Sequence, residues 1–277
     1  MSPIAKLGGF AAGLALVGAV AALAGSAADV HPGRPSAARA AMAGHGERTP
    51  DPVRGLAVSA DGLTLALART SAPAGERTDL RFRIADRAGR TVRDFDVEHT
   101  KRMHLIVVRR DMTGFQHLHP RQDRDGGWSV PVAPRDPGAY RVFADFSVDG
   151  RPRTLAADLL VDGPMRARRL PAPAASVAVD GMRVALNAAP SRAGAESELG
   201  FTITRGGRPV QVEDYLGAKG HLVALREGDL AFLHVHPDED APRFMATFPS
   251  AGRYRLFLQF RVDGRVHTAE LTREVSR

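Results

Sequence analysis

The chain contains no cysteine in its 277 residues. Disulfide bonds and thiolate metal ligands are therefore excluded, and the folded parts must be stabilised by the burial of apolar side chains. Lysine is scarce too: it occurs only as Lys6, Lys101 and Lys219, so the net charge of +7 comes mainly from arginine. The arginines alternate with apolar residues, and no stretch interleaves aromatic and basic residues as a nucleic-acid-binding surface does. We expect no nucleic-acid partner.

The beginning of the chain has almost no charge, since Lys6 is the only charged residue before Asp29. Residues 1–28 therefore form either a signal peptide, with small residues at its end for cleavage, or a membrane anchor, for which the apolar run is long enough. Both alternatives predict a secreted or cell-surface protein, which meets the membrane only through this segment if it is uncleaved. Residues 29–52 are rich in Ala, Gly, Pro and Arg without a hydrophobic period, which predicts a flexible linker.

The hydrophobic period of an amphipathic helix is absent after residue 52. Short runs of alternating apolar and polar residues, separated by turn residues, are present instead, which is the pattern of β-strands. The series of strands and turns in residues 53–163 is repeated in residues 176–277, and the proline-containing residues 164–175 form a linker. The sequence therefore predicts an all-β fold of two tandem immunoglobulin-like β-sandwich domains.

Two aromatic positions support the repeat. The order Asp136, Gly138, Tyr140 has the form of the tyrosine corner of immunoglobulin-like sandwiches, and Tyr254 occupies the same place in the second half. Phe143 and Phe257 also correspond, and they lie on the strand face opposite these tyrosines. An aromatic repeated there indicates that the two domains pack together or bind a partner, or that each ring is covered within its own domain.

Histidine is concentrated in two segments that each predict a β-hairpin, residues 101–120 and 218–237. Side chains two apart on a strand share a face, and a tight hairpin brings the facing strand within reach. Three imidazoles of the first hairpin therefore converge on one patch. These histidines recur in the second hairpin with one constant offset, so that the two sets are His104, His117 and His119, and His221, His234 and His236.

Two segments make the sequence similar to a known group. Residues 103–111 with Phe115 to Pro120, and residues 215–221 with Leu233 to Pro237, resemble exported bacterial proteins with immunoglobulin-like domains of the YtkA-like and CopC-like kind. The resemblance covers most of residues 54–275, and its most specific part is the His-x-His-Pro pair. It implies a small β-sandwich at the cell surface with a role in copper handling. Met103 aligns with Gly220, so a methionine ligand is not repeated, which disfavours a soft Cu(I) site.

Neutral imidazole is a common ligand of copper and zinc, and a set of histidines without thiolate favours copper(II) or zinc(II). We therefore expect an exported metal-binding protein with one three-histidine hairpin site per domain and one open coordination position in each. Asp123 and the acidic run Asp238 to Asp240 could add a carboxylate. Besides the metal ion, the expected partners are a membrane metal transporter or another cell-surface protein.

Other interpretations stay open. The histidines could instead be packed at the rim of a core, in an extracytoplasmic structural or interaction module without metal. A cupin-like metalloenzyme is disfavoured, because Gly228 and His234 have the cupin spacing but the expected glutamate is absent, and no other catalytic motif occurs. We therefore expect no enzyme activity. His99 and His267 have no counterpart in the other half and are predicted to lie at the surface, as is Arg109, with an anion-binding role as the alternative for Arg109.

Overall fold

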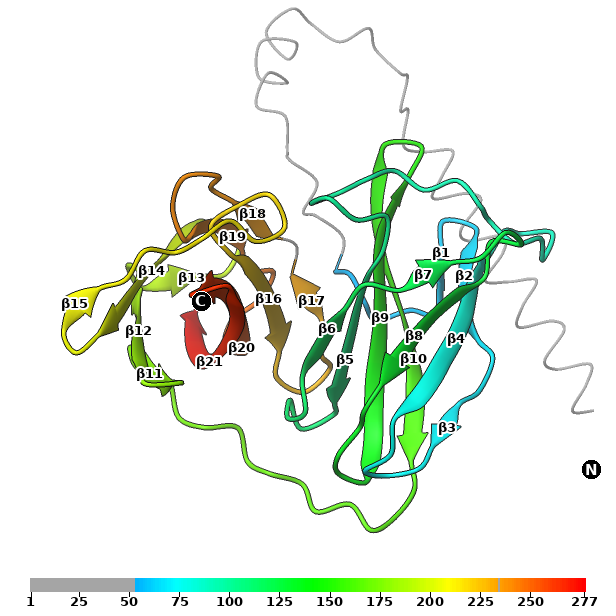
Figure 1. Cartoon of the computed structure of the whole chain (residues 1–277), viewed down its shortest axis with the longest axis horizontal. Helices are drawn as coiled ribbons and strands as arrows, with labels where there is room; N and C mark the ends of the chain where they lie inside the picture. Colours follow the sequence, from blue (N-terminus) through cyan, green and yellow to red (C-terminus); the bar gives the residue numbers. More distant parts are fainter. Residues whose placement is uncertain (1–52, 234) are drawn as a thin grey trace, which may run out of the picture. The chain divides into compact units, whose positions relative to one another are not determined.

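The computed structural model describes residues 53–277 except residue 234 (Figure 1). The predicted signal peptide or anchor at residues 1–28 and the predicted linker at 29–52 lie outside the described residues. All regular elements of the described part are β-strands. Within that part, no helix has the length and the apolar character that a membrane span requires.

The first domain consists of two five-stranded sheets, with strand orders β1-β2-β4-β8-β7 and β3-β10-β9-β5-β6. Neighbouring strands are antiparallel except β3 and β10, which are parallel. The strands are β1 (Ser59–Ala60), β2 (Leu63–Leu67), β3 (Ser71–Ala72), β4 (Thr78–Ala85), β5 (His104–Arg109), β6 (Gln116–Leu118), β7 (Arg121–Gln122), β8 (Trp128–Val132), β9 (Gly138–Val148) and β10 (Arg151–Val161).

The second domain repeats this topology. Its sheets have the orders β11-β12-β14-β19-β18, with β15 added to β14, and β13-β21-β20-β16-β17, and β13 is again parallel to its neighbour β21. The strands are β11 (Ser176–Val179), β12 (Met182–Asn187), β13 (Ser191–Arg192), β14 (Glu196–Arg205), β15 (Arg208–Pro209), β16 (His221–Arg226), β17 (Phe232–Leu233), β18 (Val235–Pro237), β19 (Arg243–Thr247), β20 (Gly252–Val262) and β21 (Arg265–Ser276). The prediction of two tandem β-sandwich domains is confirmed.

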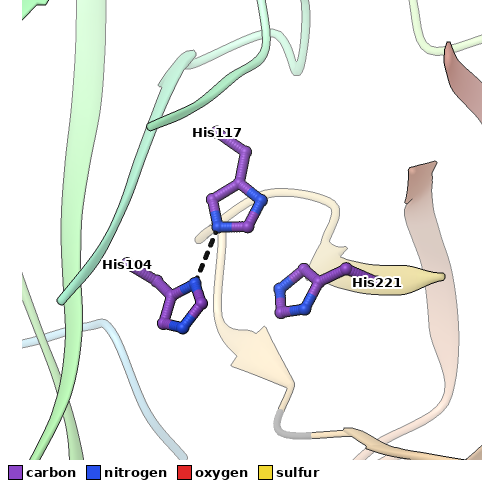
Figure 2. A group of neighbouring side chains, drawn as sticks. All are labelled: His104, His117 and His221. Carbon is purple, nitrogen blue, oxygen red and sulfur yellow. Dashed lines mark hydrogen bonds between the residues drawn. The ribbon is translucent and has the colours of Figure 1, made fainter. Parts of the chain in front are cut away.

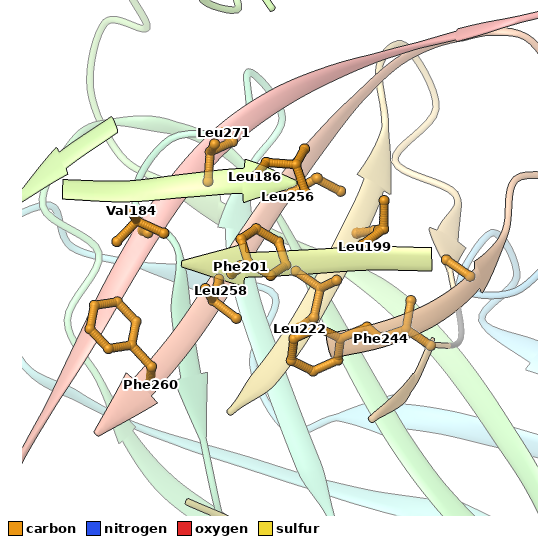
Figure 3. Close-up of a cluster of buried hydrophobic side chains, with 14 of the residues drawn as sticks. Val184, Leu186, Leu199, Phe201, Leu222, Phe244, Leu256, Leu258, Phe260 and Leu271 are labelled. Carbon is orange, nitrogen blue, oxygen red and sulfur yellow. The ribbon is translucent and has the colours of Figure 1, made fainter. Parts of the chain in front are cut away.

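Each sandwich has its own apolar core between its two sheets. In the second domain, inward-facing residues of β12, β14, β16, β19, β20 and β21 fill this space (Figure 3). The predicted tyrosine corner is present in both copies. The hydroxyl of Tyr140 donates a hydrogen bond to the carbonyl of Asp136, and that of Tyr254 donates to the carbonyl of Ser250, each at 2.9 Å. The second corner therefore forms with serine in place of aspartate, because the acceptor at 2.9 Å is a backbone carbonyl, which either residue supplies.

A third apolar cluster is shared by the two domains. Alternate residues of β5 point to opposite faces, so Leu105 and Val107 lie in the core of the first domain while Ile106 and Val108 lie in the shared cluster. Strand β16 divides its residues in the same way. Buried residues of both copies meet in this cluster, namely Ile106, Val108, Met112, Phe143 and Ala156 with Val223, Leu225, Leu230, Phe232 and Phe257. The two domains therefore pack through equivalent faces, one of the alternatives that the repeated phenylalanines indicated.

Arg109 is buried, contrary to the prediction of a solvated residue. Its side chain is 3% exposed and donates hydrogen bonds to the carboxylate of Asp111 at 2.7 and 2.9 Å, and to the carbonyl of Pro137 at 3.2 Å. The same carboxylate accepts a bond from the backbone N–H of Arg168, in the linker between the domains. The arginine thus helps to attach the linker to the first domain.

The shared cluster should contribute strongly to stability. Phe257 is fully buried there, and its ring stacks on Phe115 of the other domain with centroids 4.1 Å apart. We expect Phe257→Ala to lower the free energy of unfolding by about 3–5 kcal/mol in denaturant titrations, because it leaves a cavity between the domains. The exposed Val266→Ala serves as control, with a change within about 0.5 kcal/mol. A loss below about 1 kcal/mol for Phe257→Ala would contradict this packing in solution.

Candidate metal centre

The hairpin of β5 and β6 positions two of the predicted histidines. His104 begins β5 and points to the same side as Ile106, toward the second domain, because the two residues are two apart on the strand. His117 on β6 is paired directly with Ile106 and therefore shares this side. The prediction that His104 and His117 converge from neighbouring strands is confirmed.

The third histidine comes from the other domain. His221 begins β16, and it lies on the side of Val223 and Leu225 that faces the shared cluster. One ligand atom each of His104, His117 and His221 lie within 4.8 Å of one another (Figure 2). The ring of His221 stacks on that of His104, with centroids 5.4 Å apart and planes 4° apart, and its centroid is 4.6 Å from that of His117.

Hydrogen bonds constrain where the protons of two of these rings lie. Nε2 of His104 is 3.1 Å from the carbonyl oxygen of Glu98, and Nδ1 of His117 is 2.6 Å from Oε1 of Gln259 in the second domain. In this orientation of the Gln259 amide both oxygens only accept hydrogen bonds, so each of these nitrogens carries the hydrogen of its neutral ring. In this orientation the Nε2 of Gln259 donates to Oγ1 of Thr268 at 3.4 Å.

The remaining nitrogens of these two rings face each other. Nδ1 of His104 and Nε2 of His117 are 3.0 Å apart, the contact drawn as a dashed line in Figure 2. With the Gln259 amide in this orientation, two neutral imidazoles supply two N–H groups for three polar contacts, so one contact brings two lone pairs together. A shared metal ion removes this conflict. Bonds of about 2.0–2.1 Å to a tetrahedral zinc ion would place two such nitrogens about 3.3 Å apart, close to the separation observed.

A shared proton is the alternative to a metal ion, and burial disfavours it. Desolvation lowers the pKa of His104 from 6.5 to about 4 and that of His117 to about 3. Desolvation also lowers the pKa of His221 well below its usual value, and the charges of neighbouring histidines act in the same direction. The rings are therefore neutral at pH 7, which is the form that binds a metal ion.

The other predicted ligands are not members of this group of three. The ring of His119 lies 5.1 Å from that of His104 and 4.8 Å from that of His117, and its buried Nε2 has no hydrogen-bond partner among the described residues. Its ligand atoms are outside the group of three. His234 lies outside the described residues. His236 is on β18, which pairs with β19 in the other sheet rather than with β16. A separate site of His221, His234 and His236 therefore stays a prediction.

The acidic residues expected near the histidines accept hydrogen bonds within the turns in which they lie. Asp123 accepts backbone hydrogen bonds from Asp125 and Gly127, and Asp238 accepts one from Asp240 and pairs with Arg243. No predicted carboxylate belongs to the group of three histidines. These aspartates therefore give no support to a carboxylate ligand within the described residues.

A different carboxylate, Asp145, lies beside the site. Asp145 is the cross-strand partner of His104, and both line a cavity of about 30 Å³ together with His221. Thr154 Oγ1 donates a hydrogen bond to it at 2.6 Å, and burial raises its pKa to about 6. At neutral pH this aspartate places a negative charge next to the histidines.

Sequence reasoning missed Gln259 and Asp145, although a signal was present. They occupy corresponding positions in the two copies, paired across the strands with His221 and His104, and each interrupts an apolar run. Polar residues at matching positions of two buried strands indicate a shared polar site.

Two histidines predicted to lie at the surface also proved different. His267 is 7% exposed and bonds to Asp180 at 2.7 Å. The ring of His99 lies 6.1 Å from that of His104 and 5.9 Å from that of His221. His267 is thus held by a carboxylate away from the three histidines, whereas His99 lies beside them.

The fold and the histidine cluster define a class: tandem immunoglobulin-like β-sandwich domains with a candidate metal centre to which both contribute. The chain belongs to the family described as "Domain of unknown function (DUF8832)", which matches residues 57–163 and 176–277. No curated protein matches the sequence.

Several solved structures are similar at low scores. The Escherichia coli adhesin FdeC is 16% identical, over 80% of this chain and 66% of that chain, with a TM-score of 0.27. A Salmonella alpha-2-macroglobulin mutant is 15% identical, over 82% of this chain and 15% of that chain, with a TM-score of 0.29. The fibronectin(III)-like modules of Clostridium thermocellum CbhA are 13% identical, over 77% of this chain and 94% of that chain, with a TM-score of 0.24. The chain thus spans less than two thirds of the length of the first two. Scores this low carry no functional argument.

The buried histidines predict an acid-sensitive fold in the metal-free protein. The pKa of His119 is lowered to about 4 by burial, like that of His104, whereas the pKa of an unperturbed histidine is 6.5. Between these values the unfolded chain binds more protons than the folded chain, so the free energy of unfolding falls as the pH is lowered. Asp145, with its raised pKa, acts in the opposite direction below about pH 6 but is a single group against several histidines.

We therefore expect the melting temperature of metal-free protein to drop by at least about 5 °C between pH 7 and pH 5. Replacing His104, His117 and His221 together by glutamine should flatten this dependence, because the groups that take up protons only on unfolding are gone. Differential scanning calorimetry across this range measures the effect. A melting temperature that is level in the unsubstituted protein would show that these rings are not desolvated.

Proposed function

We propose that this protein binds one Cu²⁺ or Zn²⁺ ion between its two domains, through His104, His117 and His221, as an extracytoplasmic metal-binding protein. The observation that carries the proposal is the pair of imidazole nitrogens 3.0 Å apart, in two rings whose outer nitrogens both face oxygen acceptors. The N–H groups on the far side of both rings are held by the carbonyl of Glu98 and the amide of Gln259. Such outer hydrogen bonds usually orient histidine ligands in metal sites.

The kind of ion follows from the donor set. Three neutral imidazoles without thiolate or thioether favour Cu²⁺ or Zn²⁺, and Cu²⁺ binds more tightly to a given nitrogen site. The charge of Asp145 offsets part of the cost of burying a cation. The resemblance of the His-x-His-Pro segments to YtkA-like and CopC-like proteins supports copper as the physiological ion.

Binding rather than catalysis is the role we propose for the site. The adjoining cavity of about 30 Å³ has room for about one or two water molecules. We propose that the ion is handled at the cell surface, where the apolar segment of residues 1–28 directs or anchors the chain. The partner that gives or takes the ion would then be a membrane metal transporter or another cell-surface protein.

Calorimetric titration of the metal-free full chain with Zn²⁺ or Cu²⁺ tests the proposal. We expect one ion per chain, and affinity reduced at least about 100-fold in His117→Ala and in His221→Ala, because each removes one of three ligands. His267→Gln is the matched control and should bind as the unsubstituted chain does. Two ions per chain would instead support the separate site predicted in each domain. No uptake would contradict metal binding and leave the histidines as structural residues.

The role of Gln259 gives a second test. Gln259→Leu preserves the size of the side chain but removes the acceptor that holds the proton of His117 on Nδ1. We expect affinity for Zn²⁺ to fall about 10–100-fold with one ion still bound, as for other outer hydrogen-bond partners of ligands. Gln259→Glu keeps an acceptor and should bind at least as tightly as the original. Equal affinity in the leucine variant would mean that this hydrogen bond does not orient the ligand.

A further inference from the structure

The turn that precedes β5 has an unusual backbone. Glu98 and Lys101 exchange two backbone hydrogen bonds of 2.8 and 2.9 Å, and the residues between them, His99 and Thr100, have φ angles of +46° and +67°. Two consecutive positive φ angles are the pattern of a type I′ turn, which favours asparagine and glycine. For a β-branched residue such as threonine a positive φ is an outlier. A conformation of this kind persists when something else in the structure requires it.

In the second copy the same turn contains a glycine, as is usual for a positive φ. There Tyr215 and Ala218 exchange the backbone bonds, and the central residues are Leu216 and Gly217, with φ angles of +59° and +86°. A glycine thus occupies the position of Thr100. The two turns lie next to each other, since a Cβ on Gly217 would be 3.6 Å from Cγ2 of Thr100. The first copy therefore keeps a strained turn at the contact between the domains, with a histidine where the second copy has leucine.

The strained turn serves the metal centre in two ways. The carbonyl of its first residue, Glu98, accepts the N–H of His104 and so leaves Nδ1 of that ring free for a ligand. Its second residue, His99, lines the same cavity as His104 and His221. His99 is half-buried at this cavity, on the side of the cluster away from His117.

The ring spacings place His99 within reach of a shared ion. Imidazoles bound to one tetrahedral ion through bonds of about 2.0–2.1 Å have centroids about 5 Å apart. The three rings of the proposed site are 4.6–5.4 Å apart, and His99 is 5.9 and 6.1 Å from two of them. A shift of about 1 Å by a half-buried side chain completes the set.

We propose that His99 is the fourth ligand of the interdomain metal site and that it closes the site on the side of the cavity. The inference rests on the proposed binding of an ion by His104, His117 and His221. Four imidazoles complete a tetrahedral shell and leave no position for a reacting water, so the site retains its ion. An ion that is released toward the cavity then passes His99, which lines it.

The test compares two glycine variants of the full chain. Glycine accepts positive φ without strain, so both His99→Gly and Thr100→Gly should melt at or above the temperature of the unsubstituted metal-free protein. Only His99→Gly removes an imidazole. We expect it to bind Zn²⁺ at least about tenfold more weakly and to release it faster to a chelator, while Thr100→Gly matches the original. Added free imidazole should restore binding in His99→Gly, which a purely structural residue would not permit.

Other outcomes overturn the inference. If His99→Gly binds and releases Zn²⁺ as the original chain does, His99 is no ligand, although the three-histidine site stands. If His119→Ala weakens binding and His99→Gly does not, the fourth ligand is His119. If Thr100→Gly is weakened as much as His99→Gly, the turn conformation rather than the imidazole controls affinity. If the unsubstituted chain takes up no Zn²⁺ or Cu²⁺, the proposed function fails first.

Discussion

The burial of β5 and β16 on both faces is the constraint on which the rest of the structure depends. Each strand sends one set of alternate residues into its own sandwich and the other set against the opposite domain. An antiparallel strand of an isolated sandwich would have one face in water. Here both faces are apolar along nearly the whole strand, and the polar exception on the outer face is the first residue, His104 or His221. The histidines are therefore desolvated by the same packing that joins the domains.

The two copies share their topology but contribute different residues to the candidate metal centre. The first copy supplies a hairpin with two histidines that face the second domain, whereas the second copy supplies His221 and the amide that contacts His117. In both copies the chain leaves the hairpin and joins the opposite sheet, as β7 and as β18, but β16 and β17 pair over two residues where β5 and β6 pair over three. Duplicated domains that pack through equivalent faces resemble a twofold dimer, and here the symmetry is broken at the candidate metal centre.

Much of the fold could be predicted from the sequence because its signals are local. Alternation of apolar residues, Asp-Gly turns and the two Gly-x-Tyr strands each depend on neighbours along the chain. The convergence of His104 and His117 followed from the hairpin, since the strand period decides which side chains share a face.

The composition of the centre could not be predicted in the same way. Alternation shows that Ile106 and Val223 are apolar on their outer faces, but not that these faces meet. Without that contact His221 and Gln259 have no reason to lie beside His117. The turn at His99 and Thr100 lacks the glycine or asparagine that is typical of a positive φ. The sequence therefore did not predict this turn or the position of His99 beside the other histidines.

The attachment of the linker by Arg109 and Asp111 has a consequence for how tightly an ion can be held. The carboxylate that accepts the backbone N–H of Arg168 shortens the free length of chain between the two sandwiches. Ligands from both domains then meet as parts of one molecule, at an effective concentration set by that short tether rather than by the amount of protein present. Two untethered sandwiches would have to find each other before they could share an ion. At the proposed site the covalent linker and its contact with Arg109 and Asp111 would make the assembly of the ligands a unimolecular step, which is independent of protein concentration.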